Sequence, residues 1–189
     1  MSRSSAVGVD FPGLRSPGVG FEAPFEMLAA CHERVERMLD LLTRLRAHVS
    51  QQGCDEQARS AAADVLRYFD LAAPQHHLDE ERHVFPAVLA LQQEPLDRLV
   101  ARLQHEHRQM ETLWATVRGA LAQVTQADAP SWTPWSAADN TAMDAFVAIY
   151  QDHIRDEENC VYPAAQQALA LPLLQAMSFD MARRRGSQD

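Results

Sequence analysis

The segment HHLDEERHVFP (residues 76–86) occurs a second time as HIRDEENCVYP (residues 153–163). Both copies place a His four residues before the first of two glutamates and end on an aromatic residue followed by proline. A His and a Glu four residues apart lie on one face of an α-helix, one turn from each other, so imidazole and carboxylate can reach one ion together. The repeat therefore predicts two helical turns that jointly build a metal site.

Composition and charge exclude several classes of protein. The 189 residues are 47% hydrophobic and 23% charged, as in an ordinary globular protein, and this length fits one domain with a continuous core. A net charge of −9 argues against a nucleic-acid partner, because phosphate binding needs a basic surface. No apolar run approaches the roughly 20 residues that span a bilayer, and the N-terminus has no signal-peptide pattern. We therefore expect a cytoplasmic protein without a membrane partner.

Apolar residues recur at helical spacing through most of the chain. Three- and four-residue spacing predicts helices over residues 21–50, 55–91, 96–126 and 136–163. Gly53 supplies a stop for the first helix, and Asp55 and Ser136 are suitable N-caps for the second and fourth. Pro74 and Pro86 are expected to interrupt the second helix, which would leave its ligand turn as a short segment between two prolines.

The predicted fold class is all-α. Strand signals are almost absent, and four long helices joined by short loops predict an antiparallel, up-down-up-down four-helix bundle. The predicted organisation is an extended N-terminal arm over residues 1–20, the bundle over 21–170, and a C-terminal helical tail over 171–189. The basic end of that tail, RRRGSQD, is expected to fray.

Two further histidines complete a candidate ligand set. Aligning His32 with His107 also aligns Leu28 with Leu103, so each half of the chain reads as a helical hairpin with one single His and one His-x-x-x-Glu. Imidazole with carboxylate suits iron, manganese or zinc, and carboxylates bridge ions roughly 3.5–4 Å apart. The donor set predicts a dinuclear centre with room for an oxo or hydroxo bridge and a small ligand. The candidate metal ligands are His32, His76, Glu80, His107, His153 and Glu157.

The first copy also contains a rival register, His77 with Glu81. Its equivalents in the second copy are Ile154 and Glu158, and isoleucine cannot bind a metal, which favours His76 with Glu80. The second glutamate of each pair is then expected to face solvent or to orient a ligand.

Two other histidines offer further alternatives. His105 competes with His107, but the hairpin alignment places His105 opposite Ala30 rather than opposite His32. Glu80 and His83 form Glu-x-x-His, the ligand pair of ferritin-like di-iron bundles, yet the second copy has Cys160 at the place of the His. Both observations favour the six-residue set.

The four ligand segments, in this order on four predicted helices, resemble the hemerythrin-like, or HHE cation-binding, family over about residues 24–165. The resemblance implies a four-helix bundle around a non-haem di-iron centre with bridging carboxylates, in which zinc or manganese can replace iron. Oxygen-carrying members have a further His one turn before the third-helix ligand, where this chain has Leu103.

The same resemblance implies a protein that binds or senses a small ligand such as O2 or NO, or that serves iron or redox homeostasis. Two alternatives use the same residues: a di-iron enzyme that reduces peroxide or nitric oxide, and a metal site that only stabilises the bundle. No separate acid, base or nucleophile stands out in the sequence, which favours a binding protein over an enzyme.

Overall fold

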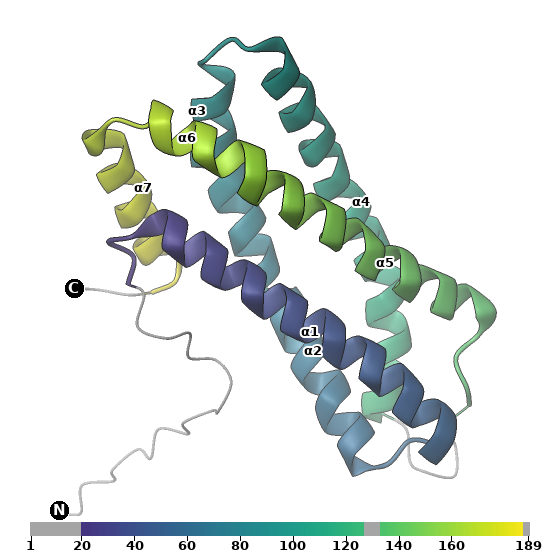
Figure 1. The fold of residues 1–189 in the computed structure, drawn as a ribbon. Helices are drawn as coiled ribbons and strands as arrows, with labels where there is room; N and C mark the ends of the chain where they lie inside the picture. Colours follow the sequence, from purple (N-terminus) through teal and green to yellow (C-terminus); the bar gives the residue numbers. More distant parts are fainter. Residues whose placement is uncertain (1–19, 127–132, 187–189) are drawn as a thin grey trace, which may run out of the picture.

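The computed structural model describes residues 20–126 and 133–186, and over these ranges the chain is helical and contains no β-strand. The all-α prediction is therefore confirmed for the described part of the chain. Four long helices lie side by side: α1 contacts α2, α2 contacts α4, α4 contacts α5, and α5 contacts α1 to close the bundle (Figure 1). These helices are α1 (Pro24–Gln52), α2 (Glu56–Asp79), α4 (Glu94–Gln126) and α5 (Ala137–Asp156).

The predicted helix boundaries are set by local side-chain and backbone chemistry. Gly53 ends α1 with a φ of 80°, a left-handed value that glycine adopts without strain, and its N–H bonds the carbonyl of Val49. Asp55 caps α2 by accepting from the Ala58 N–H at 2.8 Å. Ser136 forms a capping box with Asp139 at the start of α5, so the three boundary signals read from the sequence are confirmed.

The prediction that two prolines isolate the ligand turn is wrong. Pro74 lies inside α2, and the chain stays helical through η1 (Glu80–Val84), a π-helical segment, into α3 (Phe85–Leu89). The Phe85 N–H bonds the Glu80 carbonyl, an i→i+5 bond that accommodates one extra residue without ending the helix. Pro86 causes no break because it lies in the first turn of α3, where the missing N–H is not needed.

The second copy repeats this geometry. There α5 runs through the π-helical η2 (Glu157–Val161) into α6 (Tyr162–Ala168), with Pro163 in the first turn of α6. π-helical turns inside α-helices occur frequently at functional sites. In this protein each one begins at the glutamate that the sequence singles out.

Two apolar clusters fill the bundle, one above and one below a polar layer. On α1, Leu28 belongs to one cluster and Val35 to the other, and His32 lies between them. On α4, Leu103 and Met110 belong to different clusters in the same way, with His107 between them. The candidate ligands therefore occupy a layer with packed apolar side chains on both sides.

The C-terminal tail forms α7 (Leu171–Arg184), which packs against α1 (Figure 1). The expectation that its basic end frays is wrong for Arg184 and Arg185, because both guanidinium groups bond the buried carboxylate of Asp79. Residues 1–19 of the predicted N-terminal arm and the last three residues of the tail lie outside the described residues. None of the described helices has the length and apolar character needed to cross a membrane.

Candidate metal centre

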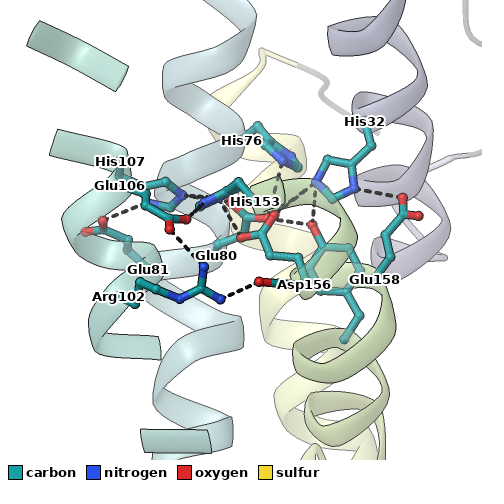
Figure 2. A network of polar contacts seen from close by, with 12 residues as sticks. His32, His76, Glu80, Glu81, Arg102, Glu106, His107, His153, Asp156 and Glu158 are labelled. Atoms are coloured by element: carbon teal, nitrogen blue, oxygen red, sulfur yellow. Dashed lines mark hydrogen bonds and ion pairs between the residues drawn. The ribbon is translucent and has the colours of Figure 1, made fainter. Parts of the chain in front are cut away.

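The six predicted ligands come together in one layer of the bundle (Figure 2). None of these six residues is more than 2% exposed to solvent. Buried ionisable groups are costly unless they are paired with one another or hold a metal, so this arrangement needs a reason. The histidines His32, His76, His107 and His153 come from α1, α2, α4 and α5, and the glutamates Glu80 and Glu157 begin η1 and η2.

The donor atoms form two groups that share both glutamates, Glu80 and Glu157. His32 and His76 complete the first group, and the histidines of α4 and α5 complete the second. Within each group the four donor atoms lie within 4.8 Å of one another. Two neighbouring positions, each facing two imidazoles and the same two carboxylates, are an arrangement in which the carboxylates can bridge a pair of cations.

Carboxylates outside the two groups orient three of the four imidazoles. Each accepts a hydrogen bond from an Nδ1–H, which leaves the Nε2 lone pair directed into the layer. The sequence left open whether the second glutamate of each pair faces solvent or orients a ligand, and both Glu81 and Glu158 bond a candidate ligand. The pairs are His32 with Glu158, His107 with Glu81, and His153 with Glu106, each at 2.9 Å (Figure 2).

Glu106 is a functional residue that the sequence interpretation missed. It precedes His107 on α4 but orients His153 on α5, so no spacing along one helix points to its role. Arg102 bonds Glu106 at 3.0 Å and also bonds Asp156, the residue before Glu157 (Figure 2). This network connects α4 to the ligand turn of α5.

Several buried nitrogen and oxygen atoms of the candidate ligands lack a suitable hydrogen-bond partner. These atoms test whether the site fits cations. His107 and His153 have their Nδ1 atoms on carboxylates, and their Nε2 atoms lie 3.0 Å apart. Oε2 of Glu80 and both carboxylate oxygens of Glu157 lack a well-aligned hydrogen bond, although Glu157 Oε1 lies 3.0 Å from His153 Nε2. Converging acceptors without donors are unfavourable unless a proton or a cation lies between them. The residues fit a pair of metal ions.

Without a metal, protons take the place of the cations. Burial lowers the pKa of His153, but the Glu157 and Glu106 carboxylates outweigh it and raise that pKa to about 9. Burial raises the pKa of Glu157, yet the His153 and His32 side chains hold it well below its usual value. Burial and the neighbouring Glu157 charge raise the pKa of Glu80. A metal ion must displace these protons, so binding releases them.

Tyr162 makes the two groups unequal. Its hydroxyl donates to Glu80 Oε1 at 2.5 Å and lies 3.1 Å from His32 Nε2, and its ring stacks on His32 with centroids 5.3 Å apart. The equivalent aromatic residue of the first copy is Phe85, whose ring lies 5.6 Å from that of His107. The group that contains His32 thus has the Tyr162 hydroxyl beside its donor atoms, whereas the group that contains His107 has the apolar Phe85 ring beside it. The one-hydroxyl difference between the repeats was the sequence signal for this asymmetry.

The rival histidines lie outside the two donor groups. His77 stacks on His107 with ring centroids 4.0 Å apart, His105 is exposed on α4, and His83 Nε2 lies 3.0 Å from Asp180 Oδ2 on α7. Neither the rival register nor the Glu-x-x-His alternative adds its histidine to a donor group.

A cavity of about 160 Å³ adjoins the second group, between α2, α4 and α5. His77, Glu81 and His107 line it on the side of the metal layer, and Glu81 is 41% exposed, so the cavity also reaches the surface. A dry apolar cavity of similar volume, roughly 150 Å³, holds benzene or xenon in another protein. The remaining lining is mostly apolar: Phe69, Ala73, Pro74, Leu78, Met110, Glu111, Trp114, Phe146 and Tyr150.

Comparisons with known proteins agree with this geometry. A family model described as "Hemerythrin HHE cation binding domain" matches residues 23–165, a range that includes all six candidate ligands and ends before α7. A protein of Haemophilus influenzae named "Uncharacterized protein" is 26% identical over 162 residues, which is 86% of this chain and 90% of that relative.

Proposed function

The chain belongs to the hemerythrin HHE cation-binding family, and from this premise we propose that its buried layer holds two iron ions in an antiparallel, up-down-up-down four-helix bundle. We propose that this centre binds or senses a small ligand such as O2 or NO, or serves iron or redox homeostasis. One observation carries the proposal: two four-donor groups share Glu80 and Glu157. In this assignment Glu80 and Glu157 would be shared by the two ions, and each ion would have the two imidazoles of its own group.

The charge of the donor set supports a dinuclear centre. The four imidazoles are neutral, so the two carboxylates would offset two of the four positive charges of a divalent pair, and an oxo bridge would neutralise the rest. Imidazole and carboxylate donors also accept zinc or manganese, so either can substitute for iron. When bound, iron supplies an open coordination position to the small ligand, while the buried layer limits access of water.

Metal analysis with optical spectroscopy tests this proposal. We expect about two iron ions per chain after loading, and near-ultraviolet charge-transfer bands in air that change on reduction and on addition of azide. The azide response shows that a coordination position is open to an outside ligand. A protein that takes up a single metal ion, or whose spectrum stays unchanged with azide, would contradict a ligand-binding di-iron centre.

We also propose that the small ligand reaches the centre through the cavity beside His107. Ala73, which is 3% exposed, lies one turn before His77 in the cavity wall, and Ala73→Leu would fill part of that space. We expect this change to slow azide association, measured by stopped-flow absorbance, while the iron content stays the same. Ala145→Leu adds the same atoms to a groove on the outer side of α4 and α5 and is the matched control. Equal rates in the two variants would exclude this route.

A further inference from the structure

The C-terminal helix α7 contacts the first ligand turn although it lies outside the range matched by the family model. Three side chains at the C-terminal end of α7, counting its C-cap residue Arg185, reach three positions spaced four residues apart on α2 and η1, so the contacts form one stripe along that element. The contacts are Arg184 to Gln75 at 3.0 Å, Arg184 and Arg185 to Asp79, and Asp180 to His83 at 3.0 Å.

Asp79 is the central contact. It is fully buried and directly precedes Glu80, the carboxylate shared by both donor groups. Arg184 bonds its Oδ1, and Arg185 bonds its Oδ2 at 2.5 Å. A buried carboxylate that loses its cationic partners is strongly unfavourable, and it escapes that cost only by reaching water.

In the second copy of the motif, the aspartate before the shared glutamate is also bonded by an arginine, but this arginine comes from α4. Asp156, which directly precedes Glu157, bonds Arg102 of α4, a residue within the matched domain. Each bridging glutamate is thus preceded by an aspartate that an arginine holds in place. For Glu157 the arginine belongs to the bundle itself, whereas for Glu80 both arginines come from α7.

We infer that Arg184 and Arg185 of α7 are positioning residues that keep Glu80 in the metal layer by holding Asp79. Without them the uncompensated Asp79 carboxylate moves toward solvent and carries the start of η1 with it. A π-helical turn is the segment of this element that rearranges at least cost, because its hydrogen bonding is already irregular. Weaker metal binding after loss of the arginines follows only if the proposed metal centre is correct. The displacement of η1 follows in either case.

The test compares the double variant Arg184→Ala/Arg185→Ala with Arg183→Ala. Arg183 is the matched control because its side chain is 70% exposed and its guanidinium bonds Asp180 at 3.3 Å. We expect the double variant to bind metal about 10- to 100-fold more weakly in chelator competition, the range typical of lost outer-sphere partners, and the control to match the unmodified protein.

Amide hydrogen exchange on the metal-free protein separates positioning from general destabilisation. We expect faster exchange in η1 and unchanged exchange in η2 for the double variant. Val124→Ala, in the core cluster away from α7, should affect neither segment selectively. Adding Asp79→Asn to the double variant should restore slow exchange and metal retention, because an amide has far less drive to reach water than a carboxylate.

Distinct outcomes separate this inference from the proposed function. If the double variant retains metal and η1 protection like the Arg183→Ala protein, α7 has no positioning role. If the unmodified protein binds no metal, the proposed function is wrong. A comparison of amide hydrogen exchange in η1 and η2 still decides whether α7 has a positioning role. Arg185→Ala alone, which retains Arg184, provides the same comparison should the double variant not fold.

Discussion

Glu157→Gln is expected to remove both metal ions from the iron-loaded protein. Glu157 belongs to both donor groups and is 0% exposed, so its loss affects the two positions together. Glutamine keeps the shape of the side chain, but its neutral amide offers one weak carbonyl donor where two cations need a charged bridge. We expect the iron content to fall from about two ions per chain to near zero, measured by metal analysis after desalting.

The matched control for Glu157→Gln is Glu33→Gln. It removes one carboxylate from a residue whose side chain is 64% exposed on α1, and it should leave the iron content unchanged. Circular dichroism of both metal-free variants checks that the helices form. If the Glu157→Gln protein retained two irons with an unchanged spectrum, a bridging role for this carboxylate would be wrong.

Phe146→Ala is expected to be strongly destabilising. The Phe146 ring is fully buried and packs against Phe69, Trp114 and Tyr150 with centroids 5.0, 5.6 and 5.1 Å apart. Truncation of a buried Phe removes its transfer free energy and leaves a cavity. The free energy of unfolding should fall by about 3–5 kcal/mol, measured by urea denaturation of the metal-free protein.

Phe179→Ala on α7 is the matched control for the core substitution. Its ring is 66% exposed, so the free energy of unfolding should change by no more than about 0.5 kcal/mol. Similar losses for the two variants would show that the bundle core does not have the packing described. Metal-free protein is needed for both measurements, because a metal ion bound to the folded state alone adds its own stabilisation.

Glu157 lies in the candidate metal layer, and Phe146 lies in the apolar core beside it. The apolar clusters on either side of the candidate metal layer hold the four helices together. The layer itself buries ionisable side chains, and apolar packing does not offset the cost of that burial. In the proposed metal centre, metal binding would offset the cost of burying those groups and would couple metal affinity to folding. Chelator treatment and core substitutions should therefore act on the same unfolding transition.

Much of the fold and of the candidate site was predictable because the signals are local. Helical periodicity, Asp55 and Ser136 as N-caps, and Gly53 as a stop depend on residues a few positions apart. The pairing of His76 with Glu80 and of His153 with Glu157 follows from one helical turn. The repeat then separated candidate ligands from other histidines, and the structure gathers the resulting six residues in one layer.

The errors and omissions concern features that short spacing does not encode. Pro74 and Pro86 were expected to interrupt the second helix, but Pro74 lies inside α2 and the chain stays helical through η1 into α3. Arg184 and Arg185 were assigned to a fraying end because they lie in a basic run at the end of the last helix. Their partner, Asp79, lies more than a hundred residues away.

The sequence by itself determined the helices, the paired ligand turns and the family, since each depends on residue types at helical spacing. Only the tertiary structure decided which side chains surround those turns. The bond of Glu106 to His153, the hydroxyl of Tyr162 on Glu80, and the arginines on Asp79 all join different elements. Such contacts depend on the relative rotation and height of packed helices, and side-chain packing across the whole bundle sets both.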